Sequence, residues 1–206
     1  MAHPSDPLFR TFHALRIKGF AKAETVAEVA DLPLTVVEEH LSALAQREWA
    51  MFREARELWQ LTPVGREEHR IALTEDVGNS RLSAGLREPY GVFLAINERF
   101  KGLCGDWQLR GGQPNDHSDG AYDRDVVQCL VELNNDAAPV VARMGDVLER
   151  LAPYGPRLAR TCQRVVEGET NMFTGVMCGS YHDVWMELHE DLILTQGIDR
   201  AAEGSF

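Results

Sequence analysis

The chain lacks the features that mark disulfide-rich, secreted and membrane proteins. Its 206 residues contain no C-x-x-C pair, and Cys104, Cys129, Cys162 and Cys178 lie far apart. A protein of this size does not depend on cross-links, so we expect reduced thiols. No apolar run approaches the roughly 20 residues of a bilayer span, and the start lacks the basic-then-apolar pattern of a secretory signal. These absences predict a cytoplasmic protein without a membrane partner.

Common enzyme signatures are absent as well. The sequence has no G-x-S-x-G elbow, no G-x-x-x-x-G-K-[ST] loop and no G-x-G-x-x-G turn. No nucleophile stands beside a candidate base. We therefore predict that the protein is not an enzyme, with no catalytic residues and no cofactor.

Acidic residues are unevenly distributed along the chain. The formal net charge is -11, from 21 Lys+Arg and 32 Asp+Glu. Residues 1–74 hold 9 Lys+Arg and 11 Asp+Glu, a net of -2, whereas residues 75–206 hold 12 and 21, a net of -9. Nucleic acid favours basic partners. The acidity that opposes DNA binding therefore belongs to the second part.

The first part predicts short helices followed by a hairpin. Helical spacing of apolar residues indicates helices over Leu8–Phe20 and Glu24–Ala30. A third helix begins at a reciprocal capping pattern of Thr35 and Glu38. Its inward positions are Val37, Leu41 and Leu44, which turns Val36, Glu39, His40 and Ala43 outward. Strand-like runs at 49–53 and 58–61 predict a hairpin, and Thr62-Pro63 starts another helix.

This order of elements is that of a winged helix-turn-helix, three helices plus a β-hairpin wing. The tract AETVAEVADLPLTVVEEHLSALAQREW, followed by ELWQLTPVGREEH, resembles the DNA-binding half of MarR-type bacterial transcription regulators. In that family the second wing strand runs into an L-T-x-x-G-R helix start, matched here by Leu61, Thr62, Gly65 and Arg66. The resemblance implies a DNA-binding domain over residues 1–75.

In a winged helix the third helix enters the major groove and the wing straddles the backbone. We expect base contacts from the outward helix face and phosphate contacts from arginines. The DNA-binding candidates are Thr35, Val36, Glu39, His40, Ala43, Arg47, Arg53 and Arg56. Glu38 and Glu39 oppose this role because phosphates repel carboxylates, although one can accept from a cytosine amino group. The alternative is a winged helix kept as a protein-interaction or regulatory subunit that does not read DNA.

The second part shows no strand-like alternation and predicts an all-helical domain over residues 76–206. Glu88-Pro89 opens the first helix, and the others cover Tyr122–Asp136, Pro139–Leu151, Pro156–Glu167 and Ser180–Gln196. The tracts WQLR, HSDGAYD, YGPRLARTCQRV and SYHDVWMELHEDL resemble the helical C-terminal region of actinobacterial regulators that carry the same winged helix. This second resemblance implies a mostly α, two-domain protein of gene regulation.

The last predicted helix carries SYHDVWMELHEDL. One apolar face holds Tyr181, Val184, Trp185, Leu188 and Leu192, and its neighbour holds His182, Met186, His189 and Ile193. We expect both faces to be buried and the solvent side to hold Asp183, Glu187, Glu190 and Asp191. The two histidines lie two turns apart, about 10 Å along the axis, which is too far to share a small ion as an H-E-x-x-H pair does.

Aromatic and histidine side chains of the second part are candidates for lining a pocket for a mostly apolar ligand. The ligand-binding candidates are Trp107, His117, Tyr122, Tyr181, His182 and Trp185. The same rings also suit an ordinary core. A metal site at His117 and its neighbouring aspartates rests only on analogy with GntR-type regulators, whose motifs are absent, so no metal ligand is predicted. We expect Arg110 and Arg157 to form internal salt bridges rather than to bind a ligand carboxylate.

Together these patterns predict a ligand-responsive, homodimeric transcription regulator. Repression relieved by ligand is the commoner arrangement, so we expect a repressor. Residues 1–75 are expected to bind operator DNA, and residues 76–206 to bind a small-molecule effector and dimerise. The alternatives are the interaction subunit and, less favoured, a metal-dependent helical sensor or enzyme.

Overall fold

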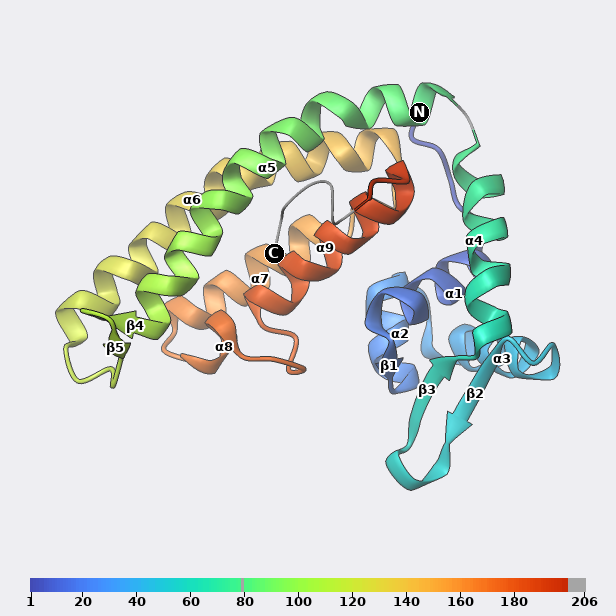
Figure 1. Ribbon diagram of the computed structural model, residues 1–206, viewed down its shortest axis with the longest axis horizontal. Helices are drawn as coiled ribbons and strands as arrows, with labels where there is room; N and C mark the ends of the chain where they lie inside the picture. Colours follow the sequence, from blue (N-terminus) through green and yellow to red (C-terminus); the bar gives the residue numbers. More distant parts are fainter. Residues whose placement is uncertain (79, 200–206) are drawn as a thin grey trace.

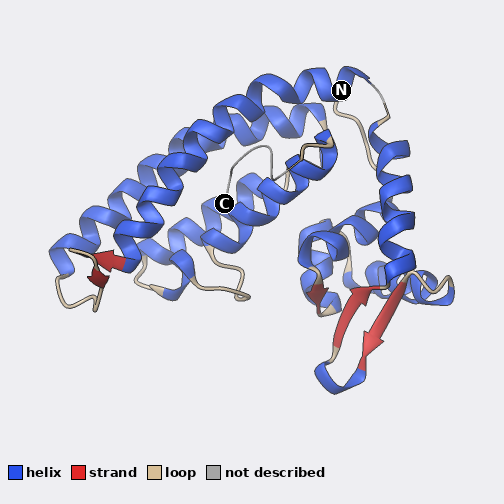
Figure 2. Ribbon diagram, in the orientation of Figure 1, coloured by secondary structure: helices blue, strands red, loops and turns tan. Residues whose placement is uncertain are grey.

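The computed structural model describes residues 1–78 and 80–199, and these are mostly helical (Figures 1 and 2). The described strands form one three-stranded antiparallel sheet and one two-stranded ribbon. Two hydrophobic cores are present, one built from residues between 12 and 61 and the other from residues between 86 and 192. We call residues 1–78 the N-terminal lobe and residues 80–199 the helical lobe.

The N-terminal lobe surrounds its core with four helices and the small sheet. Its elements are α1 (Pro7–Lys18), β1 (Phe20–Ala21), α2 (Ala23–Ala30), α3 (Leu34–Gln46), β2 (Ala50–Arg53), the 3-10 turn η1 (Glu54–Arg56), β3 (Leu58–Leu61) and α4 (Pro63–Val77). The strand order is β1-β3-β2, and Phe52 pairs with Trp59 in the hairpin. The predicted helices and hairpin of this part are therefore present.

Local chemistry explains where these helices begin and end. The Asp6 carboxylate accepts from the first N–H groups of α1, and Gly19 closes that helix with a φ of 71°. At the start of α4 the Thr62 hydroxyl accepts from Gly65 N at 2.9 Å. Pro63 occupies the first turn, where its missing N–H costs little. Both helix starts follow from the sequence.

The predicted cap of α3 is wrong, although its buried face is confirmed. Val37, Leu41 and Leu44 are fully buried, as their spacing predicts. The helix begins one residue before Thr35, and within the described chain no side chain caps it. The Pro33 carbonyl instead accepts from the N–H groups of Val36 and Val37. Thr35 therefore lies inside the first turn, where its hydroxyl does not meet a free N–H.

The helical lobe is built on a long hairpin of two helices (Figure 1). Its elements are α5 (Ser80–Gln108), β4 (Leu109–Arg110), β5 (Gln113–Pro114), α6 (Gly120–Val147), the turn η2 (Glu149–Leu151), α7 (Tyr154–Val166), α8 (Asn171–Thr174) and α9 (Tyr181–Gln196). The ribbon β4-β5 connects α5 to α6. The helices α7 and α9 lie along the pair formed by α5 and α6. In the described part of the chain, no helix combines the length and the apolar character that a bilayer crossing requires.

Two proline-based boundaries predicted for this lobe are wrong. Pro89 lies inside α5 and Pro139 lies inside α6, so neither residue starts a helix. An interior proline costs a helix about 3 kcal/mol. Apolar residues on both sides of each proline, such as Leu86 and Phe93 in α5, pack into the same core and offset this cost.

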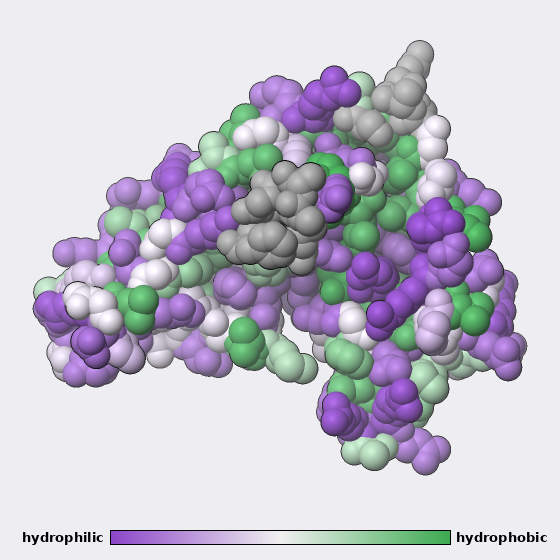
Figure 3. Space-filling model, in the orientation of Figure 1, coloured by the Kyte–Doolittle hydropathy of each residue, from purple (hydrophilic) through white to green (hydrophobic). Residues whose placement is uncertain are grey.

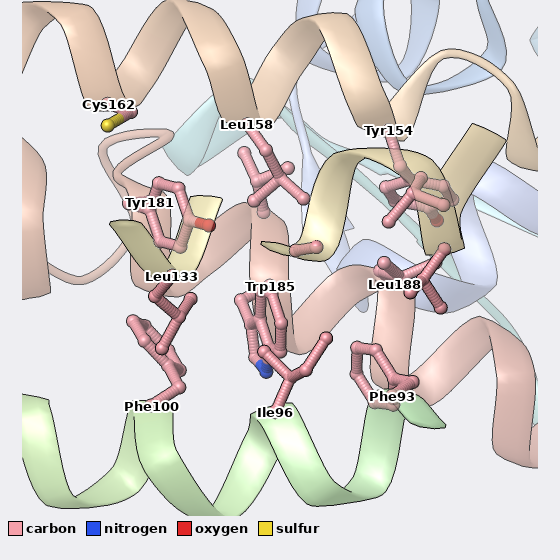
Figure 4. Packing of buried hydrophobic residues seen from close by; sticks show 14 of the residues in the cluster. Phe93, Ile96, Phe100, Leu133, Tyr154, Leu158, Cys162, Tyr181, Trp185 and Leu188 are labelled. Carbon is pink, nitrogen blue, oxygen red and sulfur yellow. The ribbon is translucent and has the colours of Figure 1, made fainter. Parts of the chain in front are cut away.

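The core of the helical lobe centres on α9 packed against α5 (Figure 4). Trp185 is fully buried and stacks on Phe93 with 4.8 Å between ring centroids. Its indole N–H donates to Asn97 Oδ1 at 2.9 Å, which satisfies the one polar group of the ring. The predicted apolar face of α9 is confirmed by this packing.

The predicted polar face of α9 is wrong at two positions. Glu187 and Asp191 are buried, with 6% and 2% of their surface exposed. The prediction is also wrong for Met186, which was expected to be buried on the neighbouring face and is exposed. Burial of a carboxylate requires a charged or hydrogen-bonding partner. Arginines of the helical lobe and basic groups of α1 supply those partners, so the acidic face of α9 is turned toward the N-terminal lobe.

Candidate functional site

The outward face of α3 is the first candidate surface. Thr35 and Glu39 are exposed, and Val36 and Ala43 are half-buried beside them. A shallow groove runs along this face and is lined by Thr35, Glu38, Glu39, Ser42, Ala43 and Gln46. The structure therefore brings Thr35, Glu39 and Ala43 together, and places two carboxylates on the same surface.

His40 departs from the expectation that it faces outward. Its ring is half-buried, and Nδ1 lies 2.9 Å from Thr11 Oγ1 of α1. This hydrogen bond holds the ring against α1, away from the exposed side of α3. His40 thus connects two helices of the N-terminal lobe.

The predicted phosphate-contacting arginines lie at two places next to α3. Arg53 and Arg56 are exposed and line one groove at the hairpin, together with Phe20, Ala55, Leu58 and Gln60. The Arg47 guanidinium lies 5.0 Å from the centroid of the Trp49 ring. The hairpin projects from the body of the molecule (Figure 1). Its two arginines are therefore available to a long, rigid partner.

Comparison with known proteins adds no identification. No protein family, curated protein or solved structure matches the chain. The assignment to MarR-type regulators therefore stays a prediction made from the sequence.

Three predicted ligand-binding residues meet at the far end of the helical lobe. Trp107 lies 4.5 Å from the His117 ring and 4.8 Å from the Phe173 ring, measured between centroids. The Tyr122 hydroxyl donates to the carbonyl of Asp106 at 2.9 Å. His117 has a φ of 56°, and its Nδ1 lies 3.1 Å from Asp123 Oδ2. Trp107, His117 and Tyr122 therefore lie at one end of the lobe, and their role in ligand binding stays a prediction.

The other three predicted ligand-binding residues lie together near the middle of the lobe. Tyr181 and Trp185 are fully buried and pack with Phe100, as Figure 4 shows. Burial raises the pKa of the Tyr181 hydroxyl well above its ordinary value. His182 is half-buried, and among the described residues its Nδ1 has no hydrogen-bond partner. Packing assigns the two large rings to the core, and only His182 leaves a polar atom unsatisfied.

The loop aspartates near His117 are used by the backbone. Asp119 accepts from the N–H groups of Ala121 and Tyr122 and so caps α6, and Asp116 accepts from Ser118 N at 3.0 Å. Within residues 1–78 and 80–199, no three His, Cys, Asp or Glu side chains are placed to hold a metal ion. The geometry of the loop is explained by turn and cap hydrogen bonds.

A buried polar cluster joins the two lobes, and the sequence did not reveal it. His13 Nδ1 lies 2.9 Å from His69 Nε2, and His13 Nε2 lies 3.1 Å from Asp191 Oδ1. Arg150 contacts Asp191 and donates to Thr195 Oγ1 at 2.7 Å. We call these residues, together with Tyr154, whose hydroxyl donates to Asp191 at 3.2 Å, the joint cluster.

A second set of ion pairs lies beside the joint cluster. Glu187 accepts from Lys18 of α1 and from Arg157 of α7, at 2.6 Å in each case. Arg16 lies 3.3 Å from Glu190. Asp76 of α4 lies 3.6 Å from the Nε of Arg150. Contacts of opposite charge therefore hold α1 and α4 against the helical lobe.

These residues were missed because their partners are distant in the chain. Glu187 and Asp191 occupy positions that a helical wheel assigns to solvent, and their charged partners lie far away in the sequence. One signal was present: His13 follows Phe12 in a strongly apolar helix, where a histidine must find a polar partner.

Two clefts flank the joint between the lobes. One, of about 750 Å³, lies between α1, β1, the start of β3 and the loop before α9. Its apolar lining comes from Ile17, Phe20 and Leu58 on one side and from Met177 and Met186 on the other. The space-filling view shows the notch between the hairpin and the helical lobe (Figure 3). The other cleft lies on the side of α2 and α7.

The buried histidines make stability depend on pH. Desolvation, with the nearby charge of His13, lowers the pKa of His69 to about 2, and desolvation also lowers the pKa of His13 from 6.5. Below pH 6.5 the unfolded chain therefore binds protons that the folded protein does not, and stability falls as the pH falls. For His69 alone the slope is about 1.4 kcal/mol per pH unit.

We expect His69→Gln to reduce by one the number of protons that the chain takes up on unfolding in acid, and so to make the unfolding free energy less dependent on pH. Glutamine keeps a hydrogen-bonding side chain near His13 but does not titrate. The measurement is the urea unfolding free energy at a series of pH values from 7.5 down to 4.5, with the value at pH 7.5 as the internal reference. Parallel curves for the variant and the parent protein would contradict the assignment of a neutral, buried His69.

Proposed function

We propose that the protein is a ligand-responsive, DNA-binding transcription regulator whose residues 1–75 form a winged helix-turn-helix. The observation that supports this most directly is the exposed face of α3 beside a projecting hairpin that carries Arg53 and Arg56. In a winged helix, α3 enters the major groove and the hairpin contacts the flanking backbone. Thr35, Glu39 and Ala43 are then the residues nearest the base edges, and Arg47, Arg53 and Arg56 contact phosphates.

The proposed regulator acts as a homodimer. The N-terminal lobe is near neutral, so one copy gathers few phosphate contacts and two copies are needed for firm binding. Two recognition helices must also be held about 34 Å apart to enter successive major grooves. A ligand that favours a different arrangement of the lobes shifts the population away from this spacing, which makes repression relieved by ligand the simplest mechanism.

A gel-shift titration tests the DNA-binding proposal. The purified protein is titrated against its own promoter region and against an unrelated fragment of equal length, at low and at moderate salt. We expect a sequence-preferring complex whose affinity falls as the salt concentration rises. If no such complex forms at either salt concentration, the proposal is rejected.

The exposed carboxylates Glu38 and Glu39 favour a second candidate, a regulatory subunit that binds another protein through α3. Acidic groups repel phosphate but suit a basic protein surface. The gel shift distinguishes the two candidates, because only the DNA-binding regulator gives a salt-sensitive complex with its promoter.

We expect the double change Arg53→Gln and Arg56→Gln to weaken DNA binding about tenfold or more at low salt. The salt slope should fall by about one for each phosphate that the variant no longer neutralises. Both arginines are exposed, so folding should be unaffected. Arg164→Gln is the control, because this arginine, whose side chain is 42% exposed, lies on α7 of the helical lobe. An equal loss of affinity in the control and the hairpin variant would argue against a phosphate-contacting hairpin.

A further inference from the structure

The second inter-lobe cleft has the character of an anion site. It encloses about 750 Å³ between α1 and α2 of the N-terminal lobe and η2 and α7 of the helical lobe. Three arginines line it, one from the N-terminal lobe and two from α7: Arg10, Arg157 and Arg160. Leu32, Pro33, Pro153 and Pro156 form much of the remaining wall.

Two of these arginines carry buried donors without an acceptor. Among the described residues, the Nε atoms of Arg10 and Arg157 are inaccessible and make no hydrogen bond. Both guanidinium groups are otherwise held in place: Arg10 Nη2 donates to the Asp31 carbonyl at 3.0 Å, and Arg157 Nη2 donates to Glu187 at 2.6 Å. Buried donors in native proteins are nearly always satisfied by protein, water or a bound ion. The hydrogen bonding of both guanidinium groups is therefore incomplete, and because the Nε atoms are inaccessible, an anion in the cleft would be bound by the outer guanidinium nitrogens.

Two of the three cations lie inside the cleft, whereas Arg160 and the carboxylates lie at its rim. The side chains of Arg157 and Arg10 are 8% and 13% exposed, whereas those of Glu28 and Asp31 are 52% and 70% exposed. Glu149 at the same rim is also exposed. Solvent screens the outer carboxylates more strongly than the inner arginines, so the inner wall favours a negative group.

Glu28 already occupies part of this position. Its carboxylate contacts Arg160, and Oε1 lies 3.9 Å from the Nε of Arg157. Because Glu28 is half-exposed and belongs to α2, it bridges the two lobes with a contact that solvent reaches. An oxyanion with more than one charge can make bidentate contacts with the same arginines and displace it.

We propose that this cleft binds a small polyvalent oxyanion, a molecule carrying phosphate or paired carboxylate groups, which competes with Glu28 for Arg157 and Arg160. Binding separates Glu28 of α2 from α7 and so loosens one of the ionic contacts between the lobes. The consequence for DNA rests on the proposed function, since α2 directly precedes α3. Anion binding itself does not depend on it.

Isothermal titration calorimetry on the full chain tests the inference without DNA. Inorganic phosphate and succinate are titrated separately at constant ionic strength, which distinguishes a phosphate from a dicarboxylate ligand. We expect saturable binding with one site per chain for at least one of them. Arg160→Gln removes a charge-assisted contact and should weaken that binding about tenfold, whereas Glu28→Gln removes the competitor and should tighten it.

Arg164→Gln is the control, because Arg164 lies on α7 like Arg160, pairs with Glu169 and does not line the cleft. It should leave the affinity unchanged. Arg160 and Glu28 are half-exposed, and thermal unfolding of each variant checks that the fold is kept. The inference is overturned if neither anion shows saturable binding at concentrations up to roughly 10 mM. It is also overturned if Arg160→Gln and Arg164→Gln bind the anion equally well. A tighter complex in Glu28→Gln supports the competition, and an unchanged one refutes it.

The calorimetry tests the anion site and the gel shift tests the regulator, so either proposal can be rejected without the other. Saturable anion binding in a protein that forms no complex with its promoter would retain the anion site and reject the regulator. A promoter complex in a protein without anion binding would retain the regulator and reject this site.

Discussion

Asp191→Ala is expected to lower the free energy of unfolding by about 3 kcal/mol, because it deprives a buried arginine of the nearer of its two carboxylate partners. Asp191 is 2% exposed and Arg150 is 6% exposed, so solvent does not replace the missing carboxylate. The Tyr154 hydroxyl and His13 lose the same partner. The measurement is urea denaturation followed by circular dichroism at pH 7.

The charge of Asp191 in the folded protein supports this expectation. Burial opposes its ionisation, but the charges of Arg150 and His13 and their hydrogen bonds outweigh burial and lower the pKa of Asp191 below its ordinary value. The carboxylate is therefore ionised at neutral pH. Its contribution to stability is present above the ordinary aspartate pKa and is lost as the pH falls through the lower folded value.

Removing both charges should cost less than removing one. The double variant Asp191→Leu with Arg150→Met leaves neither member of this pair alone, and Asp76, which also contacts Arg150, keeps its hydrogen bond from Ser5 and its contact with His3. Its loss of stability should therefore be smaller than that of Asp191→Ala. Asp136→Asn is the control, since Asp136 pairs with Arg99 on the exposed surface, where both side chains are more than half exposed. Such surface pairs contribute little. If Asp191→Ala were no more harmful than this control, the joint cluster would not hold the lobes together.

The N-terminal lobe could be predicted closely because its signals are local. The spacing of Val37, Leu41 and Leu44 identified the buried face of α3, and Thr62-Pro63 identified the start of α4. The two strand-like runs at 49–53 and 58–61, separated by polar residues, identified the hairpin. Each of these features depends on residues within a few positions of one another.

The helical lobe was less predictable because long-range packing overrides local signals there. Pro89 and Pro139 are strong boundary signals, yet the packing of α5 against α6 carries both helices through them. Glu187 and Asp191 were assigned to solvent because their partners, Lys18 and Arg150, are far away in the sequence. A buried charge cannot be recognised until its partner is placed beside it.

The candidate site likewise combines features that local sequence determines with features that depend on distant contacts. The exposed positions of Thr35 and Glu39 followed from the helical period of α3, whereas the contact of His40 with Thr11 required the position of α1. The cleft proposed to bind an anion could not be predicted from the sequence, because it combines Arg10 with two arginines of α7. The sequence assigned Arg157 to an internal salt bridge, which its contact with Glu187 confirms, but one of its donors is left unsatisfied.

Gly65→Ala is expected to be the second large perturbation, with a loss of about 3 kcal/mol in the free energy of unfolding. Gly65 lies in the first turn of α4, where the helix passes the start of the hairpin. A Cβ atom at this position would lie 1.8 Å from the carbonyl oxygen of Trp49 and 2.6 Å from its carbonyl carbon. A backbone carbonyl cannot rotate away as a side chain does, so α4 or the hairpin must shift.

The shift would break specific contacts. Gly65 N donates to the Thr62 hydroxyl at 2.9 Å, and Thr62 N donates to the Trp49 carbonyl at 3.0 Å. The first bond caps α4, and the second ties it to the segment that leads into β2, as does the Thr62 hydroxyl, which donates to the Glu48 carbonyl at 2.7 Å. This close approach explains physically why the L-T-x-x-G-R pattern places a glycine at this position. If the proposed function holds, a displaced hairpin should also weaken promoter binding.

Gly102→Ala provides the matched control, because it is the same chemical change in a helix with room for it. Within the described chain, an added Cβ at Gly102 of α5 meets no atom within 4 Å. Alanine is favoured over glycine inside a helix by about 1 kcal/mol, so this variant should be slightly more stable than the parent protein. Thermal and urea unfolding of the two variants should therefore diverge in opposite directions from the parent. Equal stability of Gly65→Ala and the parent would mean that α4 does not approach Trp49 as closely as the structure places it, and the orientation of the hairpin relative to α3 would have to be revised.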